Sequence, residues 1–167
     1  MLELMDELRS RGFDCYIVSG GGAEFVRVIG EDFYGVKPEG VVGSQIAYEL
    51  VRNHDGSTHL LRTGDIVGSG PNEGPAKPPN IMRILGRRPV VAGGNSAGDA
   101  EMLEYAQSYD GPSLALLVDH DDADREYAYE SKAGTFETEE TILRTAGRLG
   151  WVVASIRDDW DTVFADT

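Results

Sequence analysis

Apolar residues near the start of the chain recur at helical spacing and then give way to a short β-branched run. The spacing predicts a first helix from residue 2 to about residue 11, ending at Gly12. The apolar run 15–18 predicts a strand that leads into a glycine-rich loop, 19–22, and a second helix is expected over about 23–29. Helix, strand, glycine loop and helix in this order are the opening of an α/β unit.

The middle of the chain has a different pattern. Two β-rich runs, 46–52 and 58–63, flank a polar stretch that contains the pair Asp55-Gly56. An Asp-Gly pair between two such runs is typical of a tight turn, so a β-hairpin is expected over 46–63. A loop rich in glycine and proline, 68–79, follows the hairpin.

The second half of the chain alternates strands and helices. The expected elements are a helix over 79–85, a strand over 89–92, a second glycine loop with a helix over 99–106, a strand over 113–118, a helix over 139–148 and a last strand over 151–156. Residues 119–124 are expected to form a solvated acidic loop. The repeated strand–loop–helix units predict a three-layer α/β sandwich with a mostly parallel, Rossmann-like sheet, and 1–167 is expected to be a single domain.

Charge and composition narrow the choice of partners. The formal net charge is −14, which repels polyanions, so neither a nucleic acid nor an anionic membrane is an expected partner. No apolar run approaches the roughly 18 residues of a membrane span. The acidic start of the chain is unlike a signal peptide, so a cytoplasmic location is expected, with a signal on a longer precursor left open. The single cysteine, Cys15, lies in an apolar run and is interpreted as a buried core thiol.

The first candidate for chemistry is Ser19, which directly follows the first predicted strand and precedes Gly20 and Gly21. Free backbone N–H groups and a hydroxyl at the start of a helix suit the oxygens of a phosphate. A plain tight turn is the competing interpretation. A dinucleotide-binding loop is not indicated, because Phe25 stands where the third glycine of that motif belongs.

The second candidate is Lys77, in the Gly/Pro-rich loop. Pro78 and Pro79 follow it, and their stiffness could hold the ammonium group pointing inward. A lysine in that position would offset the charge of phosphate and carboxylate groups. The competing interpretation is an exposed loop lysine.

The third candidate is the segment Gly94–Asp99, which follows an apolar strand and opens a helix. Asn95 lies at the carboxyl end of the strand and Asp99 lies four residues later, so both oxygen-bearing side chains are expected at one edge of the sheet. Oxygen atoms are the ligands that Mg²⁺ selects. A simple helix cap would explain Asp99, but not the glycines and Asn95 before it.

Together these segments resemble the haloacid dehalogenase superfamily, and within it the phosphoserine-phosphatase-like hydrolases. Ser19 matches the family's second motif, Lys77 the third, and Gly94–Asp99 the fourth, in the right order over nearly the whole chain. The resemblance implies a magnesium-dependent phosphomonoester hydrolase acting on a small phosphorylated metabolite. It implies that Ser19 and the Gly20 N–H hold the phosphoryl group, that Lys77 steadies the intermediate, and that Asp99 and Asn95 bind Mg²⁺.

Two departures from the family pattern stand out. Asn95 replaces an aspartate of many members, so metal affinity should be lower. The first motif, Asp-x-Asp with its nucleophile, is missing together with the helical cap, and neither 119–121 nor 158–161 replaces it, because both come too late in the chain. His120 is interpreted as a surface histidine.

The missing motif belongs, by the resemblance, to the central strand of the sheet. Its loss would leave two unpaired strand edges, which a longer native chain, a rearranged sheet or a second copy could repair. The longer chain is the favoured hypothesis. The alternatives are a catalytically inactive module that binds phosphate, metal or a partner chain, and a phosphotransferase or mutase on the same scaffold.

Overall fold

The computed structural model describes residues 1–68, 70–129 and 132–164. It divides into two compact units, Met1–Asn72 and Glu73–Thr167. The α/β class and the mostly parallel pairing of strands are confirmed, although the parallel strands lie in two small sheets. That the chain is a single domain stays a prediction. Within the described ranges, no helix has the length and apolar character that a membrane crossing requires.

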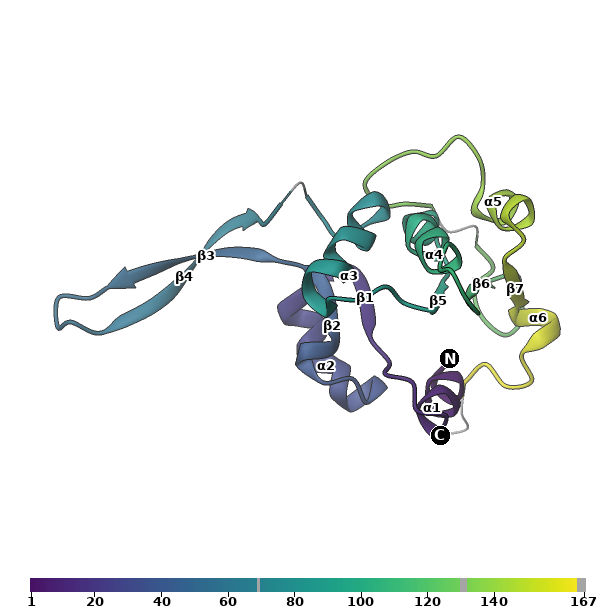
Figure 1. Ribbon diagram of the computed structural model, residues 1–167, viewed down its shortest axis with the longest axis horizontal. Coiled ribbons are helices and arrows are strands. Elements are labelled where there is room, and N and C mark those ends of the chain that lie inside the picture. The colour runs from purple at the N-terminus through teal and green to yellow at the C-terminus, as the bar shows by residue number, and fades with distance from the viewer. Residues whose placement is uncertain (69, 130–131, 165–167) are drawn as a thin grey trace. The chain divides into compact units, whose positions relative to one another are not determined.

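The first unit packs one helix against a parallel pair of strands (Figure 1). Its elements are α1 (Leu2–Ser10), β1 (Ile17–Gly22), α2 (Ala23–Tyr34), β2 (Val41–Ser44), β3 (Ile46–Arg52) and β4 (Thr58–Ile66). Val26 of α2 packs with Val36 and Val41, and Met5 and Ile17 pack against this cluster. β2 was not predicted, yet it is buried along its whole length.

The hairpin of β3 and β4 is confirmed, and β4 runs three residues beyond the predicted end of the second strand, to Ile66. Figure 1 shows this hairpin extending as a long ribbon away from α2 and the β1–β2 pair. Its turn contains Gly56 with a φ of 86°, a left-handed conformation that glycine adopts without strain. Near its base, the Tyr48 hydroxyl donates a hydrogen bond of 2.6 Å to Glu24 of α2.

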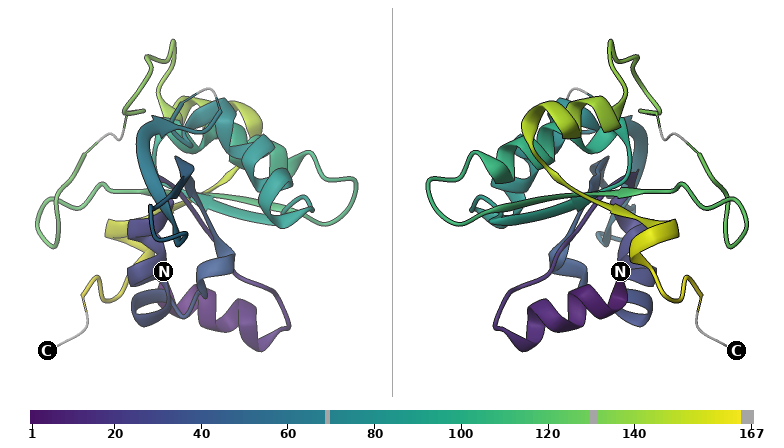
Figure 2. Two further views of the ribbon diagram at one scale, coloured as in Figure 1. Left: turned by 90° about the vertical axis from the view of Figure 1, so that its left-hand side faces the viewer. Right: turned by 90° about the vertical axis from the view of Figure 1, so that its right-hand side faces the viewer.

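The second unit is a three-stranded parallel sheet with helices. Its elements are α3 (Lys77–Leu85), β5 (Val91–Gly94), α4 (Ala100–Gln107), β6 (Leu114–Asp119), α5 (Ile142–Leu149), β7 (Val152–Ser155) and α6 (Ile156–Asp159). The strand order is β5-β6-β7, and α4 and α5 lie over one face of the sheet (Figure 2). Leu103 and Ala106 of α4, Leu117 of β6 and Ala146 of α5 are buried in this unit's core.

Several predicted boundaries were wrong. The residues predicted as loop 19–22 belong to β1, and α2 continues to Tyr34 instead of ending near residue 29. Of the predicted loop 68–79, residue 69 lies outside the described residues, and α3 already begins at Lys77. The short helix α6 was not predicted. Cys15 lies before β1 and is only partly buried, so the interpretation as a fully buried core thiol was wrong.

Candidate functional site

A buried ion pair joins the start of α3 to the segment after β5. The Lys77 side chain is 6% exposed and that of Asp99 is 9% exposed, and Lys77 Nζ lies 2.5 Å from Asp99 Oδ1. A buried charge requires a partner, because transfer of an isolated ion out of water costs several kcal/mol. Lys77 is therefore not the exposed loop lysine of the competing interpretation. Pro78 and Pro79 lie in the first turn of α3, where a missing N–H is tolerated.

The other oxygen of Asp99 organises the turn that leads into α4. Asp99 Oδ2 accepts hydrogen bonds from the Asn95 N–H at 3.1 Å, the Ser96 N–H at 3.0 Å and the Ser96 hydroxyl at 2.9 Å. Ser96 and Asp99 thereby form a capping box at the 3-10 turn Ala97–Asp99. Asp99 thus combines two roles, as the N3 acid of this capping box and as the counter-ion of Lys77, whereas its side chain makes no capping hydrogen bond to α4 itself.

The glycines of this segment are explained by close packing. A Cβ atom on Gly94 would lie 2.5 Å from the Cβ of Asp99, and one on Gly98 would lie 2.7 Å from the Cγ of Glu73. Neither distance is compatible with a side chain, so both positions require glycine for space. The glycines let two carboxylate side chains lie directly on the backbone of the turn.

Glu73 is a member of this cluster that sequence reasoning missed. Its carboxylate accepts hydrogen bonds of 2.6 Å from the Gly134 N–H and 2.6 Å from the Thr135 hydroxyl. Burial raises the pKa of Glu73, but these hydrogen bonds and the positive charge of Lys77 outweigh it, so the pKa lies below its ordinary value. Glu73 is separated in sequence from residues 134 and 135, so no local signal could reveal the contact.

Asn95 makes its side-chain contacts with a segment that follows β6. Asn95 Nδ2 lies 3.2 Å from the Tyr129 hydroxyl and 3.4 Å from His120 Nε2. His120 Nδ1 lies 2.7 Å from Glu126 Oε1, and the His120 and Glu126 side chains are 20% and 12% exposed. The interpretation of His120 as a surface histidine was therefore wrong.

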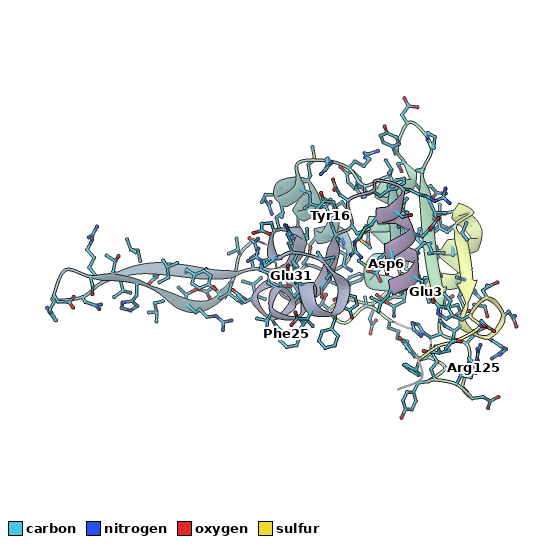
Figure 3. The ribbon with its side chains drawn as sticks, turned by 90° about the horizontal axis from the view of Figure 1, so that it is seen from below. Glu3, Asp6, Tyr16, Phe25, Glu31 and Arg125 are labelled. Atoms are coloured by element: carbon cyan, nitrogen blue, oxygen red, sulfur yellow. The ribbon has the colours of Figure 1, made fainter. Side chains whose placement is uncertain are left out.

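The predicted solvated acidic loop, 119–124, is also wrong. Asp122 is only 5% exposed, and its Oδ1 accepts from the N–H groups of Asp124 at 3.0 Å and Arg125 at 3.1 Å. Arg125, labelled in Figure 3, in turn donates to the carbonyls of Ile156 at 2.6 Å and Trp160 at 2.7 Å. The loop is thus a defined turn held from both sides.

Ser19 and Gly20 lie inside β1, at the register shift between Val18 and Gly22. The Ser19 hydroxyl, expected to hold a phosphate oxygen, accepts a hydrogen bond of 3.0 Å from the Gly21 N–H. The Gly20 carbonyl accepts a hydrogen bond of 2.7 Å from the Ser44 hydroxyl. These two residues belong to the first unit. The predicted residues that the structure brings together are Lys77, Asn95 and Asp99, all in the second unit.

The side chains of Asn95 and Asp99 are chemically suited to Mg²⁺, because both carry hard oxygen atoms. They supply only part of the six ligands that Mg²⁺ requires, and within the described ranges no three His, Cys, Asp or Glu residues form a metal-binding group. Water and substrate oxygens would complete the shell. In comparisons with known proteins, no family model matches this chain and no curated protein matches it.

Proposed function

We propose that this chain carries the lysine and metal-binding part of a magnesium-dependent phosphoryl-transfer site, and that its reaction is the hydrolysis of a small phosphomonoester. The observation that carries the proposal is the buried pair of Lys77 and Asp99, with Asn95 at the carboxyl end of β5. Ligands of parallel α/β sheets bind at that edge. The order of these residues in the sequence is similar to that of the motifs of the haloacid dehalogenase superfamily, which also supports the proposal.

The net charge of Lys77, Asp99 and Glu73 favours binding of a cation first and of an anion only afterwards. Lys77 is close to two carboxylates, those of Asp99 and Glu73, so the immediate surroundings carry a net negative charge. A divalent cation would reverse that sign and allow a phosphate to approach a protein of net charge −14. Mg²⁺, when bound, would act as a Lewis acid on the phosphoryl oxygens.

Each residue then has a distinct role. Asn95 and Asp99 would hold Mg²⁺, and the ammonium of Lys77 would neutralise charge that develops on the phosphoryl group. Ser19 and the Gly20 N–H would hold phosphoryl oxygens, a role that rests on the resemblance alone. Asp99 already has hydrogen-bond donors on both of its oxygens, so its carboxylate is held in place before any ligand binds.

The nucleophile of this proposal is an aspartate on a further strand. By the resemblance its carboxylate would attack phosphorus and displace the alcohol of the ester, and water would then hydrolyse the aspartyl-phosphate to inorganic phosphate and the free carboxylate. Within the described residues, β1 pairs only with β2 and β5 pairs only with β6, so each has an edge that accepts another parallel strand. We propose that such a strand, paired with one of these edges within a three-layer sandwich, carries the nucleophile.

Turnover of p-nitrophenyl phosphate with and without Mg²⁺ tests the proposal. The protein should include any in-frame residues encoded upstream of Met1, and it is compared with the Lys77→Ala/Asp99→Ala variant. We expect magnesium-dependent hydrolysis that the double substitution abolishes. The variant Lys77→Arg, checked for folding by circular dichroism, keeps the charge, and Lys37→Ala alters an exposed lysine as a control. Full activity of the double variant would sink the assignment.

A second candidate function is a non-catalytic module that binds a metal, a phosphate or a partner chain. The motifs of this chain contain no matching Asp-x-Asp segment, and Asp99 has a complete structural role as cap and counter-ion. This module would bind Mg²⁺ without turnover and would self-associate through its open strand edges. Calorimetric Mg²⁺ titration and light scattering of the same protein distinguish it from the enzyme. Product analysis with an added alcohol distinguishes hydrolysis from phosphotransfer.

A further inference from the structure

The amide of Asn95 has two unlike ends, and its neighbours determine which end is free. An asparagine Nδ2 only donates hydrogen bonds and its Oδ1 only accepts them. Nδ2 of Asn95 lies within 3.4 Å of two atoms that can accept, His120 Nε2 and the Tyr129 hydroxyl oxygen. Both acceptors are on the same end of the amide, so the carbonyl oxygen is the end left for a ligand.

The acceptor role of His120 follows from its other nitrogen. A carboxylate accepts hydrogen bonds, so Glu126, at 2.7 Å from Nδ1, places the imidazole proton on Nδ1. In the tautomer with its proton on Nδ1, the ring presents a lone pair at Nε2, which faces the N–H of Asn95. From Asn95 to His120 to Glu126, every donor meets an acceptor. The opposite orientation of the amide would place its oxygen against the Nε2 lone pair.

The surrounding backbone keeps these groups in place. Asn95 follows β5 and His120 follows β6, and these strands pair in parallel, so their carboxyl ends lie at one edge. The rings of His120 and Tyr129 stack with centroids 4.6 Å apart, and the Tyr129 N–H donates to the His120 carbonyl at 2.9 Å. The turn capped by Asp122 brings Glu126 back to the ring.

We propose that His120, Glu126 and Tyr129 are positioning residues that turn the Asn95 amide so that it presents its carbonyl oxygen to Mg²⁺. The inference rests on the proposed function for the identity of the metal. An aspartate in place of Asn95 would not require such neighbours, because its two oxygens are equivalent. An asparagine can present its N–H₂ group instead, which repels a cation, so the substitution makes an orienting network necessary.

Nitrogen NMR of the histidine ring in the metal-free protein tests the first half of the inference. We expect the His120 proton on Nδ1, facing Glu126 at 2.7 Å, and Glu126→Ala to admit the Nε2–H form. A proton on Nε2 in the unaltered protein would overturn the inference, whether or not Mg²⁺ binds.

Calorimetric Mg²⁺ titration of four proteins tests the second half: the unaltered chain, His120→Phe, Asn95→Asp and the double variant. Phenylalanine keeps the ring that stacks on Tyr129 and removes the acceptor. We expect His120→Phe to weaken Mg²⁺ binding about tenfold in the Asn95 background, and much less when residue 95 is aspartate. Tyr129→Phe removes only a hydroxyl and serves as a milder variant, with a smaller loss in the same direction.

The outcomes are distinct. Equal weakening by His120→Phe in both backgrounds would overturn the orienting role while leaving the proposed function intact. Absence of Mg²⁺ binding by the unaltered chain, with Nδ1–H on His120, would instead overturn the proposed metal site and, with it, the role of these residues toward Mg²⁺.

Discussion

Two glycine-rich segments, 19–22 and 94–99, follow apolar runs in the sequence of this protein, and they have very different structures. The first continues as part of β1, and the hydroxyl of Ser19 bonds to its own neighbouring backbone. The second leaves β5, forms a capping box, and holds a buried ion pair. A Cβ on Gly21 would come no closer than 3.3 Å to a neighbour, whereas on Gly94 it would come within 2.5 Å.

The difference teaches that glycine after a strand has two separate meanings. In 94–99 the glycines are required because the carboxylate side chains of Asp99 and Glu73 pack directly against them. Such packing is expected where the backbone and charged side chains together form a polar site. At Gly21 the nearest neighbour of an added Cβ is Ser19 Oγ at 3.3 Å, so packing restricts this position less than it restricts Gly94. Substitutions that affect the two segments unequally therefore test whether 94–99 is the centre of the site.

The largest effect is expected from loss of the buried ion pair. Asp99→Ala should destabilise the protein by about 3–5 kcal/mol, because it leaves Lys77 buried without its partner and removes the capping box. Lys77→Met should cost less, about 3 kcal/mol at most, since Asp99 keeps its hydrogen bonds from Asn95 and Ser96. Urea denaturation measures both. A larger cost for Lys77→Met would show that the cap contributes less than the geometry indicates.

The next effect compares matched glycines in the two segments. Gly94→Ala should destabilise by about 1–3 kcal/mol, because the new methyl group overlaps Asp99. Gly21→Ala should change stability by less than about 0.5 kcal/mol, since its nearest neighbour, Ser19 Oγ, can shift slightly. Thermal unfolding of the two variants in parallel measures the difference, and similar losses at both sites would contradict the comparison.

A smaller effect on stability is expected from Glu73 when the pH is lowered. The pKa of Glu73 is lowered in the folded protein from 4.5, so its ionised form contributes stability above about pH 4.5 that is lost as the pH falls through the folded pKa. Glu73→Gln should therefore cost about 1 kcal/mol at pH 7 and progressively less toward pH 3. Urea midpoints of both proteins across this range provide the measurement. A difference that stays constant with pH would show that the charge of Glu73 makes no contribution.

The smallest effect on stability is expected in the first segment. Ser19→Ala removes one hydrogen bond to the Gly21 N–H and should cost about 1 kcal/mol or less. If Ser19 holds phosphate, the same substitution also raises KM for p-nitrophenyl phosphate, although the variant stays folded because its loss of stability is small. An unchanged KM would assign Ser19 a purely local role in β1.

The fold was predictable where the pattern was long. The hairpin and most helices could be read from periodicity and turn residues, whereas β2 has only four residues and its signal, Val41-Val42-Gly43-Ser44, is no stronger than that of a loop. The interior glycine at residue 30 made α2 look shorter than it is. A Cβ there would lie 3.1 Å from the Val36 carbonyl, so packing against the next segment, which sequence does not display, required that glycine.

The candidate site was predictable in part for the same reason. Lys77, Asn95 and Asp99 stand at recognisable positions beside strands or prolines. Glu73 and His120 acquire their roles from partners that folding brings to them, the backbone at residue 134 and the carboxylate of Glu126. The contact between His120 and Glu126 depends on how the chain folds back after β6, which the sequence does not indicate.

Arg125 links this turn to the end of the chain. Its guanidinium donates to the carbonyls of Ile156, Arg157, Trp160 and Asp161. Local opening of the segment after β7 would therefore also release hydrogen bonds that hold the turn carrying His120 and Glu126, so we expect the two segments to exchange their amide hydrogens together. Asp121 reinforces this link, because its carboxylate accepts from the Ser155 hydroxyl at 2.7 Å and from the Arg157 N–H at 3.0 Å.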